Sequence, residues 1–209
     1  MLKSIETFFK NLDWKVCSVP ECASLLLKWD KPFYDLKDEQ KYEILKDVIM
    51  FTMDMQEQIV NSVQSIEKNV LIIYDRGTID ALAYLPRDKW QQMLLENNWS
   101  YSDLRDSRYD QVIHLVSTAI GAKANYKIDN HKFRPHNIEL ARELDNATAT
   151  AWQNHACFDI IDNSTDFRGK LWRVIEIICH ELGIDPKQTS LEHLCVECAY
   201  ILQRIPVGH

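Results

Sequence analysis

The sequence predicts an α/β protein, a three-layer sandwich in which helices cover both faces of a parallel sheet. Three short apolar runs, over residues 70–74, 112–116 and 158–161, are the main observation behind this prediction. Continuous runs of this length are typical of strands that are buried on both faces, as in parallel sheets. Amphipathic segments with helical periodicity separate the runs, and this alternation favours parallel βαβ units.

The amino-terminal third begins with an apolar helical face, formed by Leu2, Ile5, Phe9 and Leu12. A strand is expected over residues 14–19, because Pro20 and Glu21 end that run. A helix is expected over 22–29, followed by a polar turn. Residues 38–68 carry an apolar stripe at helical spacing, which predicts one long amphipathic helix before the run at 70–74.

The rest of the chain continues the alternation. Helices are expected over residues 80–84, 88–96, 138–152 and 171–182, and Gly183 ends the last of them. A final amphipathic helix is expected over 191–205. We therefore divide the chain into a domain of residues 1–185 and a C-terminal helical extension of residues 186–209.

Composition excludes several classes of protein. The net charge of −7 argues against a general nucleic-acid binder, which needs a basic face. No stretch approaches the ~18 apolar residues that span a bilayer, and no signal segment opens the chain. We expect a cytoplasmic protein with reduced cysteines. Cys195 and Cys198 are expected to be buried helix residues rather than zinc ligands, and His114 a core histidine rather than a catalytic one.

The strongest candidate site follows the run at 70–74. Asp75, Arg76 and Gly77 come directly after it. In open α/β sheets ligands bind beyond the carboxyl ends of the strands, where a carboxylate can hold Mg²⁺ and an arginine can reach a phosphate. The alternative is a strand that ends in a polar turn without a ligand.

Several motifs, in this order and spacing, resemble the P-loop AAA-type domain shared by bacterial nicotinamide-nucleotide regulators and animal TRP translocation defect proteins. They are Pro20-Glu21, Asp75-Arg76-Gly77 with Asp80, the stretch from Arg134 to Asp145, and Phe158-Asp-Ile-Ile-Asp-Asn-Ser-Thr-Asp-Phe167. Residues 99–166 are most similar to the animal branch. The resemblance covers about residues 1–180.

This resemblance implies a P-loop NTPase-like fold that binds GTP or ATP with Mg²⁺. Asp75 matches the carboxylate on the magnesium side, and Arg134 and Arg142 match arginines of a lid over the phosphates. Glu21 matches an acidic residue that acts as a base or a hydroxyl ligand where catalysis occurs. We add Arg76 and Asp80 as nucleotide-side candidates, and Asn163 as a base or ribose contact; for Asn163 a simple turn is an equal alternative.

The animal branch also implies a regulatory protein that recognises a phosphoinositide or phosphatidic acid at a membrane surface and takes part in moving TRP channels. Two other functions stay open. One is a small-molecule kinase of the nicotinamide-riboside type, and the other is an interaction module that binds no nucleotide.

The sequence departs from this family in one respect that bears on function. Its first glycine is Gly77, so no Gly-x-x-x-x-Gly-Lys-Ser/Thr phosphate loop precedes the site. Such a loop supplies backbone donors, a lysine and a hydroxyl to the phosphates and Mg²⁺. We expect the chain to start just after this loop and its central strand, and to lack the β-rich second domain of the animal relatives. Loss of that strand would leave unpaired strand edges inside the sheet.

Overall fold

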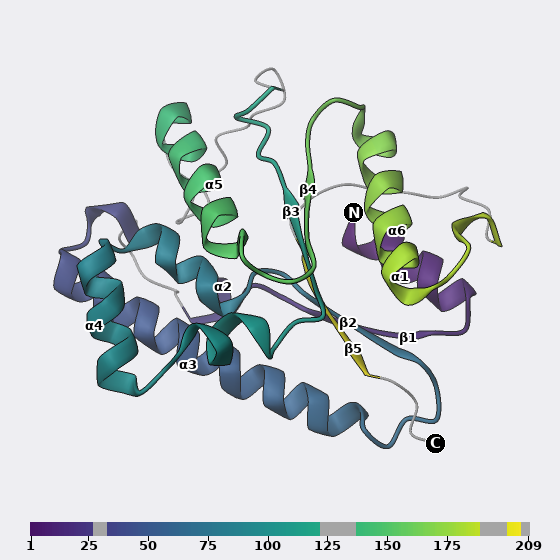
Figure 1. The fold of residues 1–209 in the computed structure, drawn as a ribbon, viewed down its shortest axis with the longest axis horizontal. Coiled ribbons are helices and arrows are strands. Elements are labelled where there is room, and N and C mark those ends of the chain that lie inside the picture. The colour runs from purple at the N-terminus through teal and green to yellow at the C-terminus, as the bar shows by residue number, and fades with distance from the viewer. Residues whose placement is uncertain (27–32, 122–136, 189–199, 206–209) are drawn as a thin grey trace.

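The computed structural model describes residues 1–26, 33–121, 137–188 and 200–205. Arg134, Cys195 and Cys198 lie outside the described residues, so the expectations for them stay predictions. In the described part, helices pack on both faces of a single sheet (Figure 1).

The sheet contains four strands that follow one another along the chain and a fifth from its carboxyl end. They are β1 (Lys15–Val19), β2 (Val70–Tyr74), β3 (Gln111–Leu115), β4 (Phe158–Ile161) and β5 (Tyr200–Ile205). Their order in space is β1-β2-β5-β3-β4. β1 pairs with β2 and β3 pairs with β4, both in parallel. The predicted strands and their parallel pairing are thus confirmed.

The helices form two layers. On one face lie α3 (Asp38–Val63), α4 (Arg87–Asn97), α5 (Ile138–Trp152) and the 3₁₀ helix η2 (Thr78–Tyr84). On the other face lie α1 (Leu2–Asn11) and α6 (Phe167–Leu182). Shorter elements are α2 (Cys22–Leu26), η1 (Phe33–Asp35), the π-helical η3 (Ser102–Asp106) and η5 (Pro186–Gln188).

Strand β2 shows why this arrangement forms. All five of its residues are buried. Val70, Ile72 and Tyr74 belong to the core beneath α3 and α4, whereas Leu71 and Ile73 belong to the core beneath α1 and α6. Side chains alternate between the two faces of a strand, so a continuous apolar run requires cover on both sides. The three-layer sandwich predicted from the sequence is confirmed.

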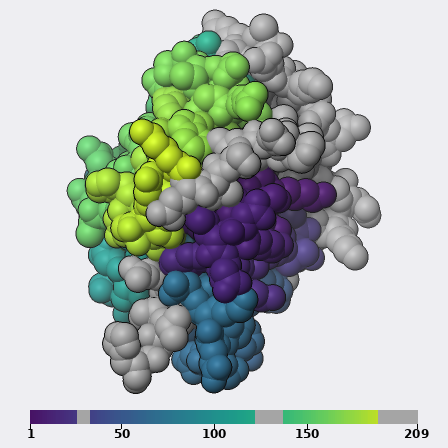
Figure 2. All heavy atoms as spheres, turned by 90° about the vertical axis from the view of Figure 1, so that its right-hand side faces the viewer, coloured from purple at the N-terminus to yellow at the C-terminus, as the bar shows by residue number. Residues whose placement is uncertain are grey.

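The layer formed by α1 and α6 is visible in Figure 2, where the purple amino-terminal residues and the yellow-green residues of α6 lie side by side. The ring of Phe8 packs edge-on against Trp172, with 6.5 Å between the ring centroids. Asp166 caps α6 by accepting a hydrogen bond of 2.8 Å from the backbone nitrogen of Gly169. Gly183 ends the helix with φ of +67°, a conformation that glycine adopts without strain.

Two expectations about the carboxyl end are corrected. Residues Tyr200–Ile205 form a strand, so the predicted helix over 191–205 is wrong there. β5 also runs antiparallel to both β2 and β3, so the sheet is mixed rather than purely parallel. The apolar spacing that predicted a helix matches either structure over so short a run, and pairing with two free strand edges decides for the strand.

β5 also changes the expectation of unpaired edges. It pairs with β2 over five residues and with β3 over three, and so occupies the centre of the sheet. The other differences are small: α3 ends at Val63 rather than at residue 68, and residues 78–84 form a 3₁₀ helix.

Candidate functional site

The site is built where β1 and β2 end side by side. Val19 pairs with Tyr74 in the parallel register, and the backbone nitrogen of Asp75 donates a hydrogen bond of 2.9 Å to the carbonyl of Val19. This register carries the residues that follow the two strands to one edge of the sheet. Glu21 and Asp75, which are far apart in the sequence, therefore come together at that edge.

Arg76 follows in an unusual backbone conformation. Its φ is +75°, in the left-handed region that residues other than glycine rarely adopt. Such strained positions persist when their surroundings hold them, and they cluster at functional sites. The turn at Arg76 leads directly from β2 into η2. One guanidinium nitrogen of Arg76 lies 4.0 Å from Oδ2 of Asp80, and 42% of the arginine side chain is exposed.

Asp80 is held from three sides. Besides its ion pair with Arg76, its Oδ1 accepts a hydrogen bond of 2.6 Å from the indole nitrogen of Trp152. Its Oδ2 accepts one of 3.1 Å from the backbone nitrogen of Gly77. Both oxygens are thus engaged within the protein. Asp80 positions the turn and Arg76, and its assignment to a nucleotide stays a prediction.

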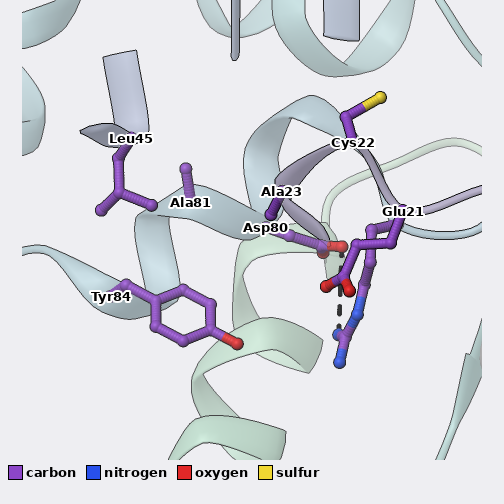
Figure 3. A pocket seen from close by; sticks show the side chains of 8 residues that line it. Glu21, Cys22, Ala23, Leu45, Asp80, Ala81 and Tyr84 are labelled. Atoms are coloured by element: carbon purple, nitrogen blue, oxygen red, sulfur yellow. Dashed lines mark ion pairs between the residues drawn. The ribbon is translucent and has the colours of Figure 1, made fainter. Parts of the chain in front are cut away.

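A pocket opens beside these charges (Figure 3). Its lining residues are Glu21, Cys22, Ala23, Leu45, Arg76, Asp80, Ala81 and Tyr84. In Figure 3 the carboxylates of Glu21 and Asp80 lie at one end, with the ion pair of Asp80 drawn as a dashed line, whereas Leu45 and Tyr84 lie at the other. The pocket therefore has a charged end and an apolar end.

The charges at this edge shift one another's protonation. The pKa of Asp75 is raised to about 6, chiefly by burial; the charge of Arg76 opposes this rise, and the charges of Glu21 and Asp80 add to it. Burial also raises the pKa of Tyr84 above its usual range. For Arg76 burial works to lower the pKa, yet Tyr84 and the three carboxylates together raise it above its ordinary value. Arg76 is thus held charged among carboxylates.

The carboxylates at this edge suit a magnesium site in which the protein supplies only one or two ligands. Within the described residues no group of three or more histidine, cysteine or acidic side chains could hold a metal ion by itself. Mg²⁺ is commonly bound by one or two carboxylates together with water and substrate phosphates. Asp75, with Glu21 as its acidic neighbour, fits that arrangement, because a divalent cation would stabilise the carboxylate that burial disfavours.

Two other predicted residues lie farther along the same edge. Arg142 of α5 donates a hydrogen bond of 2.9 Å from Nε to the carbonyl of Ala119, beyond the carboxyl end of β3. Asn163 follows β4, and its amide nitrogen donates to the carbonyls of Val116, Ser117 and Ile120 over 2.6–3.2 Å. Neither residue lines the pocket beside Glu21. The structure thus joins Glu21, Asp75, Arg76 and Asp80, and it places Arg142 and Asn163 around the loop after β3.

Comparison with known proteins identifies the domain. A family model described as an AAA domain matches residues 12–170. The chain belongs to this AAA-domain family. No curated protein and no solved structure matches the chain. The match runs from just before β1 into the first turn of α6 and agrees with the α/β architecture of an NTPase-like fold.

The AAA domain contains a buried lysine that sequence reasoning missed. Lys170 is 8% exposed, and its Nζ donates to the carbonyl of Val116 at 2.8 Å and to Oδ1 of Asn163 at 2.7 Å. Burial lowers the pKa of Lys170 to about 8. The helical spacing of Lys170 with Val174 and Ile178, both buried, was the signal that could have revealed it.

The loop after β3 in the AAA domain is fixed by several side chains. Besides Lys170, Asn163 and Arg142, Oδ1 of Asp145 accepts a hydrogen bond of 2.8 Å from the backbone nitrogen of Ser117. His114 is 8% exposed, and its Nε2 lies 3.3 Å from Oδ2 of Asp145. His114 is thus a core histidine with a partner, as the sequence predicted.

The described helices were compared with the length and hydropathy that a membrane-spanning helix needs. None of them is both long enough and apolar enough to cross a bilayer. Even α3, with 26 residues, has a polar face.

Proposed function

We propose that this AAA domain binds a nucleoside triphosphate, GTP or ATP, together with Mg²⁺ at the carboxyl edge of β1 and β2. The observation that supports this most is the group of Glu21, Asp75 and Asp80 around Arg76, with the pKa of Asp75 raised to about 6. A carboxylate with a strongly raised pKa is a candidate for a functional site, and the neighbours of Asp75, Glu21 and Arg76, line the pocket. In this proposal Asp75 faces Mg²⁺ and Arg76 and Arg142 face phosphate.

The sequence limits how tightly such a ligand binds. The 209 residues contain no Gly-x-x-x-x-Gly-Lys-Ser/Thr motif. The backbone N–H groups, the lysine and the hydroxyl with which such a loop contacts the phosphates and Mg²⁺ are therefore absent from these residues. Charge-assisted hydrogen bonds contribute roughly 1.5–3 kcal/mol each. Loss of two of them lowers affinity by about two to four decades. We therefore expect weak binding by this chain as it stands.

Calorimetric titration of Mg-GTP and Mg-ATP tests the proposal. The chain is compared with a version that carries an added strand and glycine-rich phosphate loop ahead of residue 1, and each is compared with its Asp75→Asn variant. We expect binding by the extended chain that needs Mg²⁺ and weakens in the variant, and far weaker binding by the chain alone. Micromolar binding by the chain alone, abolished by Arg142→Ala, would show that the missing loop matters less than we infer.

A second candidate function is phosphoryl transfer to a small molecule, and the pocket beside Glu21 favours it. The pocket offers a carboxylate that can accept a hydrogen bond from a hydroxyl group, beside an apolar wall of Leu45 and Ala81. Nucleotide consumption by the extended chain in the presence of candidate acceptors such as nicotinamide riboside, and its loss in Glu21→Gln, would support this function.

The resemblance to the animal TRP translocation defect branch adds a regulatory proposal. In this proposal the protein recognises a phosphoinositide or phosphatidic acid at a membrane surface and takes part in TRP channel trafficking. Co-sedimentation with vesicles of phosphatidylcholine, with and without either anionic lipid, tests the lipid part. If no nucleotide binds even to the extended chain, an interaction module without nucleotide becomes the better description.

A further inference from the structure

The loop after β3, residues 116–121, joins the two helical layers at the carboxyl edge of the sheet. Lys170 belongs to α6 and Arg142 to α5, and these two helices cover opposite faces of the sheet (Figure 1). Both side chains donate a hydrogen bond to a backbone carbonyl of this loop. A change at Lys170 can therefore reach Arg142 through the loop.

Lys170 determines which way the side-chain amide of Asn163 points. Its ammonium group can only donate hydrogen bonds, and its Nζ lies 2.7 Å from Oδ1 of Asn163. At the other end of the amide, Nδ2 faces three backbone carbonyls of the loop, and carbonyls can only accept. A flipped amide would set donor against donor at one end and acceptor against acceptor at the other. Lys170 and the loop thus favour the same orientation.

The amide of Asn163 holds the loop on both sides of the residue that anchors Arg142. That residue is Ala119, which is fully buried and whose carbonyl accepts a hydrogen bond of 2.9 Å from Nε of Arg142. Two of the carbonyls bonded to Asn163 precede Ala119, and the third, that of Ile120, directly follows it. Movement of the Ala119 carbonyl would therefore strain the hydrogen bonds to Asn163.

The anchoring of Arg142 uses only one of its three nitrogens. Among the described residues, the two terminal nitrogens of its guanidinium group have no hydrogen-bond partner. A guanidinium group is planar, so a hydrogen bond at Nε restricts where the terminal nitrogens can point. As long as the loop keeps its shape, Arg142 is held ready to donate to an anion.

We propose that Lys170 is a positioning residue for Arg142 and acts on it from the opposite helical layer, through Asn163 and the loop after β3. Without the ammonium group, Oδ1 of Asn163 loses its donor, the amide is free to turn, and the Ala119 carbonyl is released. That Arg142 meets a phosphate rests on the proposed function, whereas its positioning by Lys170 does not.

Lys170→Met tests the positioning in the intact chain without any ligand, because methionine keeps an unbranched apolar side chain and removes the ammonium group. Proton–nitrogen NMR follows the Nε–H signal of Arg142, which is identified by its absence from the spectrum of Arg142→Lys. We expect this proton to exchange with water at least about tenfold faster in Lys170→Met, because the bond to Ala119 opens more often. An unchanged exchange rate would overturn the proposal.

Gln56→Met is the matched control. Gln56 of α3 is 3% exposed, and its Nε2 donates a hydrogen bond of 2.9 Å to the hydroxyl of Tyr109, so this variant also exchanges a buried hydrogen-bonding side chain for methionine. We expect the Arg142 signal to exchange as it does in the unmodified chain. Equal acceleration in the two variants would indicate a general loss of stability and overturn the proposal.

A second variant covers the case in which Lys170→Met does not fold, as judged by circular dichroism. Asn163→Ala removes the other member of the pair and leaves Lys170 in place. We expect the same acceleration of the Arg142 signal, because the loop carbonyls lose their shared donor. An Arg142 signal that exchanges in Asn163→Ala as in the unmodified chain would contradict the route through Asn163.

Binding of Mg-GTP separates this inference from the proposed function. NMR titration detects weak binding by the intact chain, with the backbone signal of Gly77 as the reporter. We expect Lys170→Met to weaken binding by about threefold or more in the unmodified chain and to have no further effect in Arg142→Ala, because both changes remove the same contact. Equal weakening in both backgrounds would overturn the route through Arg142. If no Mg-GTP binds but the Arg142 signal responds to Lys170→Met, the result counts against the proposed function and supports the positioning.

Discussion

The indole nitrogen of Trp152 donates a hydrogen bond of 2.6 Å to Oδ1 of Asp80. This contact joins the last residue of α5 to η2, and the same carboxylate pairs with Arg76 through its other oxygen. Both residues are buried: Trp152 is 1% exposed and Asp80 is 8% exposed. The position of Arg76 at the candidate site thus depends on a helix that lies elsewhere in the sequence.

Removal of this hydrogen bond should destabilise the domain. Trp152→Phe leaves Oδ1 of Asp80 without its donor, and hydrogen bonds to charged groups contribute about 1.5–3 kcal/mol. The control is Trp90→Phe, which truncates another fully buried indole whose partner is the neutral hydroxyl of Tyr101. We expect Trp152→Phe to lower the free energy of unfolding by about 1 kcal/mol more than the control, measured by urea denaturation. A larger loss in Trp90→Phe would contradict this role of Asp80.

Asp75→Asn should stabilise the fold while removing the proposed Mg²⁺ contact. The pKa of Asp75 is about 6 in the folded protein, above its ordinary value of 3.8, so the folded state holds the proton more tightly than the unfolded state. That contribution is complete below pH 3.8 and is lost as pH rises to about 6. At pH 7 we expect Asp75→Asn to raise the free energy of unfolding by about 1–3 kcal/mol.

Asp162→Asn is the matched control for this prediction and should have the opposite sign. Hydrogen bonds from Ser164 and Arg173 lower the pKa of Asp162 to about 2, so its stabilising contribution is present above its ordinary value of 3.8 and is lost as pH falls toward 2. Chemical denaturation of both variants across pH 3–8 provides the measurement. Destabilisation by Asp75→Asn at pH 7 would show that its carboxylate is well accommodated without a cation.

Lys170 should make stability rise in alkaline solution. Burial lowers its pKa to about 8 in the folded protein from an ordinary value of 10.5, so between these values the unfolded state binds more protons. The free energy of unfolding should therefore rise with pH across this window, relative to Lys170→Met, by up to about 1.4 kcal/mol per pH unit. Lys3→Met, at an exposed position of α1, is the control. Parallel pH profiles for the intact chain and Lys170→Met would rule out the assignment.

Arg142 is predicted to contact nucleotide phosphate. In the chain extended by a phosphate loop, Arg142→Ala should weaken binding of Mg-GTP by about tenfold, because one charge-assisted hydrogen bond is lost. Arg87→Ala, on the exposed surface of α4, serves as the control and should leave binding unchanged. Calorimetric titration gives both affinities, and equal affinities in the two variants would remove Arg142 from the site.

Much of the fold could be predicted because its signals are local. The apolar run at residues 70–74 predicted a doubly covered strand, and β2 has all five residues buried. The charges at Asp75 and Arg76, directly after that strand, predicted the edge at which a pocket lies. Glu21 was assigned by resemblance, and the parallel register of β1 with β2 accounts for its place beside Asp75.

The roles of Asp80 and Lys170 could not be predicted in the same way. Asp80 was assigned to a nucleotide, which stays a prediction, whereas its hydrogen bonds from Trp152 and Gly77 were not foreseen. Lys170 is held by Asn163 and the loop after β3. Nothing in the neighbouring sequence indicates a hydrogen bond between residues 72 positions apart. Such contacts exist only after the helices have packed on the sheet.

The sequence by itself determined the alternation of strands and helices, the two-sided burial of β2 and the charged edge that follows it. These features follow from hydrophobic periodicity and from the residues that end strands and helices, and both signals act over a few residues. Only the tertiary structure decided that Tyr200–Ile205 is a strand and that it lies antiparallel between β2 and β3. The physical reason is that a short apolar segment takes its conformation from its partners: two strand edges with unpaired backbone groups draw it into the sheet, whatever its intrinsic preference.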